Sequence, residues 1–336
     1  MSVLATAGAG DHPLTQDVSV VVCAYTVDRW PRTTAALRSA MAQVPPAHEV
    51  ILVVDHNPEL YERALRELTG VAVVESTGVR GLSGARNTGL DLASGDLVVF
   101  LDDDAEADAG WLAALVAPYV SDDVMGTGGR VLAVWELTRP RWMPEEFDWV
   151  VGCSYRGLPT VEAPIRNPIG CSMSFRRHAA REAGGFRTEI GRVGTLPTGG
   201  EETDLAIRIR RLQPGSRILY EPTSTVRHHV PASRATWAYF RSRCYHEGRS
   251  KAILARLEGT TRGLSSERSY ATRVLPSGVL RGLRDLLRGD WGGALRAGAI
   301  VAGLLITTIG YASGRVRGRG AVGESDLSAQ ARPKVP

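Results

Sequence analysis

Blocks of β-branched residues alternate with amphipathic stretches along the first 130 residues of the chain. The blocks are continuously apolar, which is typical of strands buried on both faces of a parallel sheet. Strands are predicted at VSVVVC from Val18, EVILVVD up to Asp55, VAVVE from Val71 and LVVFL from Leu97, with helices from Pro31 toward Gln43, from Glu59 to Leu68 and from Ser83 to Ala93. This order predicts an α/β fold with a doubly wound, mostly parallel, Rossmann-like sheet.

The alternation breaks after Arg130. A stretch rich in Trp and Pro, Trp135 to Trp149, reads equally well as a lid or as a packing loop. Further elements are predicted as a short apolar run at Cys171–Phe175, a helix from near Glu201, short strands at 218–220 and 225–227, and a long helical stretch from Arg234 to Leu257.

The C-terminal part, residues 231–320, is predicted to be a helical extension. Residues 297–314 have about the length that spans a bilayer but are diluted by Gly, Thr and Ser, and arginines flank them. One interpretation is a segment seated on an anionic membrane; the other is a helical hairpin packed on the rest of the chain or across a homodimer interface. Residues 1–17 are expected to be a flexible arm without a secretion signal, and 321–336 a disordered tail.

Composition narrows the class of protein. The formal net charge is +4 over 336 residues, and the basic excess lies in the last third, so a nucleic-acid partner is not indicated. Cys23, Cys153, Cys171 and Cys244 form no C-x-x-C pair, which disfavours a structural zinc site and a disulfide framework. A reducing, cytoplasmic location fits best.

Three consecutive aspartates, Asp102, Asp103 and Asp104, follow the fourth predicted strand. Together with Asp55 they are expected at the carboxyl ends of neighbouring strands, where ligands of such sheets bind. Clustered carboxylates select Mg²⁺ or Mn²⁺, which commonly completes its shell with substrate phosphates. The alternative is a solvated acidic start of a new helix.

Two further segments carry candidate chemistry. Gly81 to Gly89 offers Arg86 to a diphosphate, or is simply a turn with a helix capped by Ser83. In Gly199-Gly-Glu-Glu-Thr-Asp204, Glu202 is favoured as a general base, whereas Asp204 reads more readily as the partner of Arg208 one turn on. Either His228 or His229 could complete a metal shell, although isolated histidines are more often structural.

Taken together, these motifs resemble glycosyltransferase family 2 of the GT-A fold. The resemblance rests on VVVCAY, VVD, GxxxARNxGL, FLDDD, RNPIGCSMSFRR, AGGF and GGEETDL, and it spans Val18 to Val230. It implies a catalytic domain at 18–230, with a nucleotide-sugar half at 18–130 and an acceptor half at 131–230. It also implies an inverting, metal-dependent transfer of a sugar from a nucleotide-sugar donor, expected to be a UDP-sugar, to an acceptor hydroxyl such as that of a polyprenyl-linked glycan.

The resemblance also assigns roles to residues. Ala24, Tyr25 and Asp55 would line the nucleotide pocket near Arg86, while Asp104 and Asp102 would hold the metal and Asp103 would support them. Glu202 stands where the family has its aspartate base, which leaves Glu201 as the alternative, with Asp204 a third carboxylate nearby. His228 matches the late metal-binding histidine better than His229 does.

Other functions remain possible on the sequence alone. A nucleotidyltransferase would carry a Gly-rich, Lys-bearing loop after the first strand, and CAYTVDRW is not one. A small-molecule or natural-product glycosyltransferase, and a non-catalytic nucleotide- or sugar-binding protein, stay open as alternatives.

Overall fold

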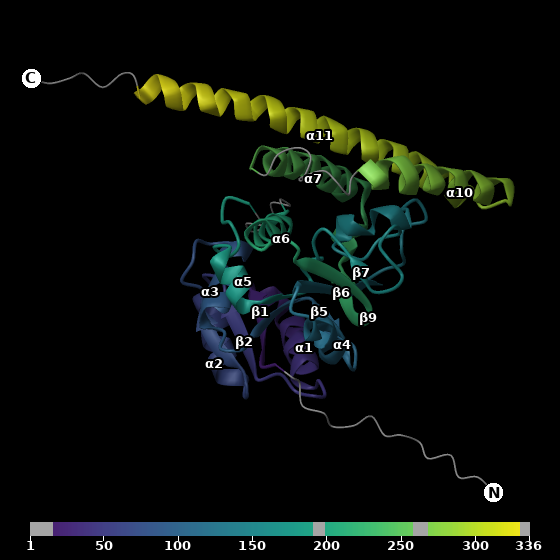
Figure 1. Ribbon diagram of the computed structural model, residues 1–336. Coiled ribbons are helices and arrows are strands. Elements are labelled where there is room, and N and C mark those ends of the chain that lie inside the picture. The colour runs from purple at the N-terminus through teal and green to yellow at the C-terminus, as the bar shows by residue number, and fades with distance from the viewer. Residues whose placement is uncertain (1–15, 191–198, 258–267, 330–336) are drawn as a thin grey trace, which may run out of the picture.

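The first half of the chain forms the predicted series of strands and helices (Figure 1). The computed structural model describes residues 16–190, 199–257 and 268–329, so nearly all of the expected N-terminal arm lies outside the described residues. Strands β1 (Val18–Ala24), β2 (Glu49–Val54), β3 (Ala72–Glu75) and β4 (Leu97–Asp102) pair in parallel in the order β3-β2-β1-β4. The connecting elements are η1 (Val27–Arg29), α1 (Trp30–Met41), α2 (Pro58–Glu67) and α3 (Leu82–Leu92).

The second half extends the same sheet with antiparallel pairings. It contributes β5 (Ala105–Ala107), β6 (Val124–Trp135), β7 (Ala163–Pro164), β8 (Ser172–Arg176) and β9 (Arg217–Val230). Strand β8 lies antiparallel between β4 and β6, and β9 follows β6 in parallel. The sheet is therefore mixed, with its first four strands parallel as the sequence predicts. The helices of this half are α4 (Trp111–Val116), η2 (Ala117–Val120), α5 (Arg177–Glu182) and α6 (Glu201–Leu212).

One prediction and one alternative reading for this half are wrong. The two short strands expected at 218–220 and 225–227 are parts of the single strand β9. A register shift between Gly129 and Arg130 of β6 accommodates the irregular residues that interrupt the apolar pattern. The aspartate triplet leads into the short strand β5, which pairs with β9, rather than into a helix.

The Trp-rich stretch packs into the protein interior. It contains η3 (Glu145–Val151), and Trp142 and Phe147 contact Phe240 of helix α7 (Trp237–Leu257) with ring centroids 5.5 and 5.3 Å apart. Phe147 and Phe240 are at most 1% exposed. These contacts favour the packing-loop interpretation over a lid.

A layer of helices covers one end of the sheet (Figure 1). After η4 (Ala232–Ala235) and α7 come η5 (Tyr270–Val274), α10 (Leu275–Leu287) and α11 (Trp291–Ala329). A Cβ at Gly248 would clash with the Thr307 carbonyl oxygen, so the backbones of α7 and α11 touch. Helix α11 runs to Ala329, beyond the predicted boundary at 320, so the expected tail is helical over 321–329. The remainder of that tail lies outside the described residues.

Candidate active site

The carboxyl ends of β1, β2 and β4 lie side by side, as the sequence predicts. Cys23 of β1 pairs in register with Asp102 of β4, and the Asp55 amide donates a hydrogen bond to the Ala24 carbonyl at 2.8 Å. The Asp55 carboxylate accepts the Gly81 amide at 2.9 Å, which ties it to the start of α3. Ala24 is buried and Tyr25 is 38% exposed. The residues at the carboxyl ends of β1, β2 and β4 therefore lie together at one edge of the sheet.

Asp103 and Asp104 are buried in the turn between β4 and β5, which excludes the solvated helix start. Arg29 contacts Asp103 Oδ1 at 3.0 Å and Asp104 Oδ2 at 3.2 Å. Burial and the neighbouring Asp104 raise the pKa of Asp103 to about 7. Although burial opposes it, the contacts with His228, Arg234 and Arg29 hold the pKa of Asp104 far below its usual range.

His228 and His229 occupy opposite sides of strand β9. His228 is 2% exposed and its Nε2 lies 3.2 Å from Asp104 Oδ1. The pairing of β9 with β5, with Ala105 opposite His228, brings the imidazole to the aspartates. Alternation along the strand turns His229 away. The structure therefore places His228, and not His229, at the acidic strand end.

Arg86 is almost completely buried below the sheet edge, with 2% exposure. Its guanidinium donates to Glu201 at 2.9 Å, to Asp102 at 3.3 Å and to the Gly170 carbonyl at 2.9 Å. The helix that carries it is capped by Gly81 rather than by Ser83, because Gly81 adopts a φ of 127° and Ser83 donates to the Ile190 carbonyl.

The three carboxylates at the start of α6 have different environments. Glu201 is buried against Arg86, and Asp204 is fully buried between Arg187 at 3.2 Å and Arg208 at 2.7 Å. Glu202 is half-buried, and burial together with the adjacent Glu201 raises its pKa to about 8. Asp204 thus has the environment of a structural ion pair, whereas Glu202 has the surface access that a base requires.

Sequence reasoning missed several groups at this site. Arg29 and Arg234 neutralise Asp104, and Cys153 Sγ lies 3.5 Å from His228 Nδ1. Cys171 lies with Asp102 and His228, with one ligand atom from each within 4.8 Å of the others. The motif RNPIGCSMSFRR contains Cys171, but only the pairing of β8 with β4 reveals its position.

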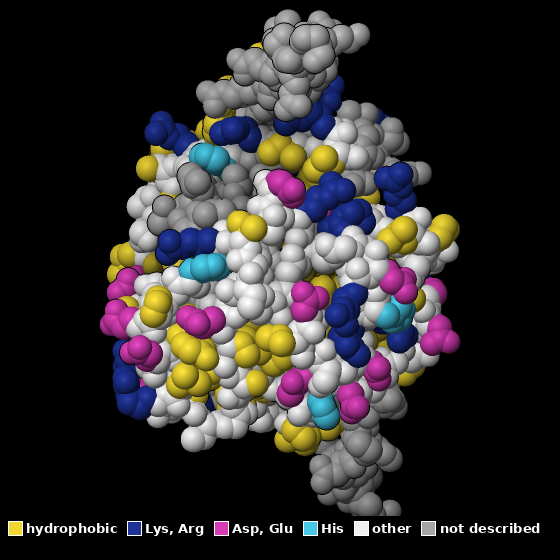
Figure 2. Space-filling model, turned by 90° about the vertical axis from the view of Figure 1, so that its left-hand side faces the viewer, with side chains coloured by type: hydrophobic (Ala, Val, Ile, Leu, Met, Phe, Trp, Pro, Cys, Tyr) yellow, Lys and Arg dark blue, Asp and Glu magenta, His cyan; other side chains and the backbone are white. Residues whose placement is uncertain are grey.

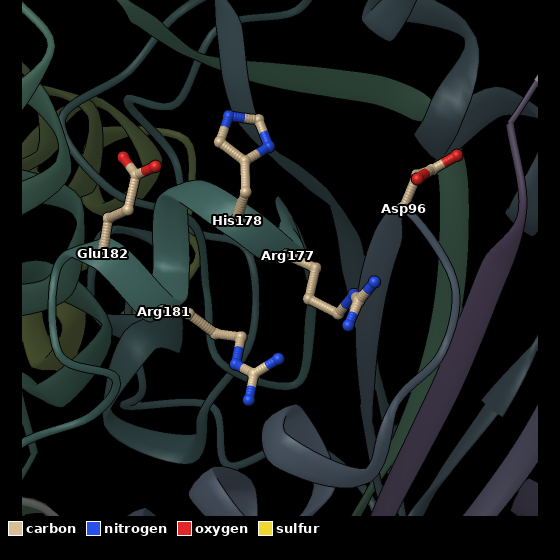
Figure 3. A pocket seen from close by; sticks show the side chains of 5 residues that line it. All are labelled: Asp96, Arg177, His178, Arg181 and Glu182. Atoms are coloured by element: carbon tan, nitrogen blue, oxygen red, sulfur yellow. The ribbon is translucent and has the colours of Figure 1, made fainter.

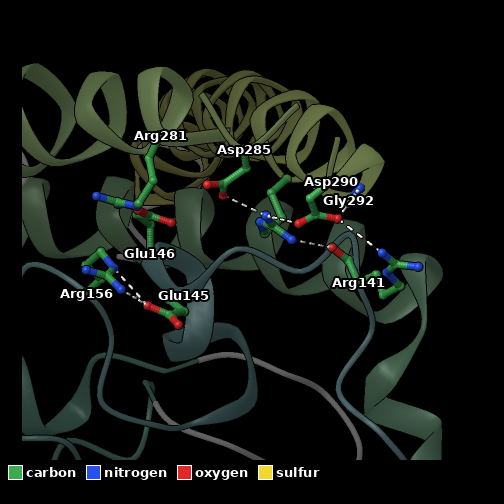
Figure 4. A network of polar contacts seen from close by, with 9 residues as sticks. Arg141, Glu145, Glu146, Arg156, Arg281, Asp285, Asp290 and Gly292 are labelled. Atoms are coloured by element: carbon green, nitrogen blue, oxygen red, sulfur yellow. Dashed lines mark hydrogen bonds and ion pairs between the residues drawn. The ribbon is translucent and has the colours of Figure 1, made fainter. Parts of the chain in front are cut away.

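Two surface cavities lie away from these residues. One, of about 370 Å³, is lined by Asp96, Arg177, His178, Arg181 and Glu182, near the start of β4 and thus at the opposite end of that strand from Asp102 (Figure 3). The other, of about 350 Å³, is lined by residues of the η3 segment and of α10 and α11, which also contact each other directly. Ion pairs line it, among them Arg281 with Glu146 and Arg296 with Asp285, and Arg141 of its lining pairs with Asp290 beside it (Figure 4). Neither cavity contains a candidate catalytic carboxylate.

Comparison with known proteins identifies the family. The family described as Glycosyl transferase family 2 matches residues 19–184. A glucosyl-dolichyl phosphate glucuronosyltransferase of Haloferax volcanii is 34% identical over 241 residues, covering 70% of this chain and 77% of its own. The succinoglycan biosynthesis protein ExoM of Rhizobium meliloti is 29% identical over 249 residues, covering 71% of this chain and 75% of its own.

Solved structures agree on the fold. A mannosyltransferase from Pyrobaculum calidifontis, determined in complex with GDP-Man and Mn²⁺, aligns over 87% of each chain with a TM-score of 0.56 and 20% identity. This chain belongs to glycosyltransferase family 2 and has the GT-A fold. It is a glycosyltransferase, which transfers a sugar from a nucleotide-sugar to an acceptor.

Proposed function

We propose that this enzyme transfers the sugar of a UDP-sugar, with inversion at the anomeric carbon, to a hydroxyl of a lipid-linked acceptor at a membrane surface. The ion-pair chain from Asp102 through Arg86 to Glu201 carries the proposal. It joins the acidic strand end to the first turn of α6, so Glu202 stands beside the donor site. The relative from Haloferax volcanii, named for glucosyl-dolichyl phosphate, supports a lipid-linked acceptor.

The strand-end residues fit a divalent cation. Asp102 and His228 offer ligand atoms within 4.8 Å of each other, and Asp104 contacts His228. We assign these three side chains as ligands of Mg²⁺ or Mn²⁺, with Asp103 supporting them through Arg29. A bound divalent cation would neutralise charge on the leaving nucleoside diphosphate. The low pKa of Asp104 keeps this ligand ionised.

The nucleoside would lie over β1 and β2. Tyr25 exposes its ring at the end of β1, and Arg29 lies over that ring at 5.2 Å. Asp55 is fixed by the Gly81 amide, so its carboxylate is oriented before a nucleotide binds. We assign Ala24, Tyr25 and Asp55 to the nucleotide pocket, with Asp55 accepting hydrogen bonds from the base or ribose.

Glu202 is the proposed general base. Inverting transfer requires a carboxylate that takes the acceptor proton while the hydroxyl oxygen attacks the anomeric carbon in line with the leaving diphosphate. Glu201 is less suited because it is 5% exposed and one of its oxygens binds Arg86. The raised pKa of Glu202, about 8, makes its carboxylate a stronger base than an ordinary glutamate.

Arg86 acts in this proposal as a positioning residue. Its three acceptors come from β4, from α6 and from the segment before β8, so one buried cation fixes their spacing. Because Arg86 is buried, it is not expected to release these acceptors in order to bind a phosphate directly. We therefore propose that the positive charge of Arg86 acts on the diphosphate site through space, without direct contact.

The outer face of α10 and α11 is proposed to bind the membrane. Trp291–Val316 of α11 has the length and hydropathy of a membrane span, but 33% of its apolar 18-residue stretch is buried in the protein. A continuous face stays exposed and apolar, at Leu280, Leu283, Leu287, Trp291, Leu295, Val301, Leu305, Ile309 and Val316. Because the opposite face of α11 packs on α7, we propose that α11 lies flat in the plane of the membrane–water interface.

Basic side chains accompany this apolar face. Arg273 of η5, Arg284 of α10 and Arg288, which follows α10, are exposed. On the side of the molecule shown in Figure 2, Lys and Arg side chains gather toward the C-terminal helices, whereas most Asp and Glu side chains lie in the lower half. An anionic bilayer surface matches this distribution.

The reaction is tested by following the product with proton NMR. The purified enzyme is incubated with Mn²⁺, a panel of UDP-sugars and a short prenyl-linked sugar acceptor. The proposal predicts a product of inverted anomeric configuration from one donor. A product that retains the donor configuration would contradict the role of Glu202 as a base in a single displacement.

A further inference from the structure

The Cys171 thiol lies at the proposed metal site. One ligand atom from each of Asp102, Cys171 and His228 falls within 4.8 Å of the other two. We infer that Cys171 is an additional metal ligand and that it makes this site bind thiophilic cations such as Zn²⁺, Co²⁺ and Cd²⁺ more tightly than a site of oxygen and nitrogen ligands would. The inference rests on the proposed metal-binding function of Asp102 and His228.

Backbone pairing fixes this cluster. Asp102 ends β4, and its amide donates to the Cys171 carbonyl at 3.3 Å. The next pair along, Leu101 with Ser172, belongs to the antiparallel ladder of β4 and β8. His228 is held opposite Ala105 by β5. Two strand pairings and one backbone hydrogen bond thus bring the three side chains together.

The chemistry of the three groups points to a cation. Cys171 is 3% exposed. Burial beside a carboxylate gives its thiol little stabilisation. A divalent cation would accept the thiolate, the carboxylate and the imidazole as ligands, and the thiol proton would leave to solvent when the metal binds. Thiolate sulfur favours Zn²⁺ and related ions over Mg²⁺, whereas carboxylate oxygen serves both.

Two neighbouring cysteines provide matched controls. Cys153 Sγ lies 3.5 Å from His228 Nδ1, and Cys23 stands opposite Asp102 in the ladder of β1 and β4. Both thiols therefore lie near the same ligands. Substitution of each cysteine by serine, one at a time, distinguishes a cysteine that binds the metal from one that only lies near it.

The experiment titrates Co²⁺, Cd²⁺ and Mn²⁺ into the full-length protein and into Cys171→Ser, Cys153→Ser and Cys23→Ser. Absorption spectroscopy detects the thiolate-to-cobalt charge-transfer band, and calorimetry gives the affinities. We expect the band in the wild type and in the two control variants, and its loss in Cys171→Ser. We also expect Cd²⁺ affinity to fall about tenfold or more in Cys171→Ser, with a much smaller change for Mn²⁺.

The wild-type spectrum tests the inference even if Cys171→Ser does not fold. Co²⁺ binding without a charge-transfer band would overturn it, and so would a band that disappears in Cys153→Ser or Cys23→Ser instead. In those cases, Mn²⁺ binding that is lost in Asp104→Ala would leave the proposed function intact. A wild type that binds none of the three cations would overturn both.

Discussion

The sheet edge and the C-terminal layer arrange charge and apolar surface in opposite ways. At the sheet edge, Asp104 and Arg86 are buried and each is held by groups of opposite charge. In the C-terminal layer, Leu287 and Trp291 are 87% and 77% exposed, while the ion pair of Arg281 with Glu146 faces the rest of the protein.

The difference indicates two separable tasks. Buried charges are costly unless partners compensate them, so a preassembled set of them suits a charged ligand such as a metal–diphosphate. A continuous exposed apolar face is unfavourable in water, so it suits a partner that is itself apolar. Changes at the sheet edge should therefore affect chemistry, and changes on the outer helices should affect location.

The largest effect is expected for Asp104→Ala. Loss of this ligand should remove several kcal/mol of transition-state stabilisation, or roughly 10³-fold in metal-dependent turnover. Asp108→Ala is the matched control, because Asp108 pairs with the exposed Arg227 at the surface. Steady-state transfer assays with Mn²⁺ and with EDTA compare the two. Equal activity of both variants would remove Asp104 from the metal site.

Glu202→Gln should separate chemistry from binding. The amide cannot accept the acceptor proton, so kcat should fall on the order of 10²-fold or more while the donor Kd stays unchanged. Glu201→Gln should instead weaken the buried pair with Arg86 and lower the melting temperature. Assays of transfer, donor binding and thermal unfolding distinguish the two. The reverse pattern would make Glu201 the base.

The pH profile should sharpen the same assignment. Glu202 acts as a base only when ionised, and its pKa is raised to about 8. We expect kcat/KM to rise with pH up to about 8 and then level off, with a slope near tenfold per pH unit below that value. The residual activity of Glu202→Gln should lack this limb. A wild-type profile that is flat between pH 6 and about 9 would contradict the assignment.

The smallest effect on chemistry is expected from the outer helices. Leu283→Ser with Leu287→Ser should weaken binding to anionic vesicles about tenfold, because each leucine contributes apolar burial. Leu65→Ser with Leu92→Ser changes two exposed leucines of helices α2 and α3, away from the outer helices, and serves as control. Flotation measures binding, and a water-soluble acceptor should be used equally well by both. An unchanged vesicle affinity together with loss of dimers would indicate a protein interface instead.

Local patterns made the first half predictable. The strands and helices up to Asp102 follow from continuous apolar runs and helix periodicity, and parallel pairing brings Asp55 and Asp102 to one edge. The second half depends on long-range pairing, which a pattern cannot specify. The sequence predicts two separate strands for the two apolar runs of β9, because their continuity depends on the bulge opposite β6.

The site residues also divide into those that a local motif identifies and those that only long-range strand pairing brings to the site. Glu202 and the aspartate triplet stand out in their motifs, and the family resemblance already favours His228 over His229. The pairing of β9 with β5 adds the physical reason, because it turns His228 toward the aspartates. No pattern of charge or spacing marks Arg29 or Cys171 as a site residue, although Cys171 lies in the motif RNPIGCSMSFRR. They reach the aspartates because η1 follows the first strand and β8 lies beside the fourth.

The most direct test is calorimetric titration of the wild type, Asp104→Ala and Glu202→Gln with UDP, GDP and CDP, in the presence and absence of Mn²⁺. The account predicts that UDP binds the wild type only with Mn²⁺, that Asp104→Ala loses this binding and that Glu202→Gln retains it. Nucleotide binding that is independent of Mn²⁺ and unchanged in Asp104→Ala would contradict a metal-dependent donor site at the end of β4.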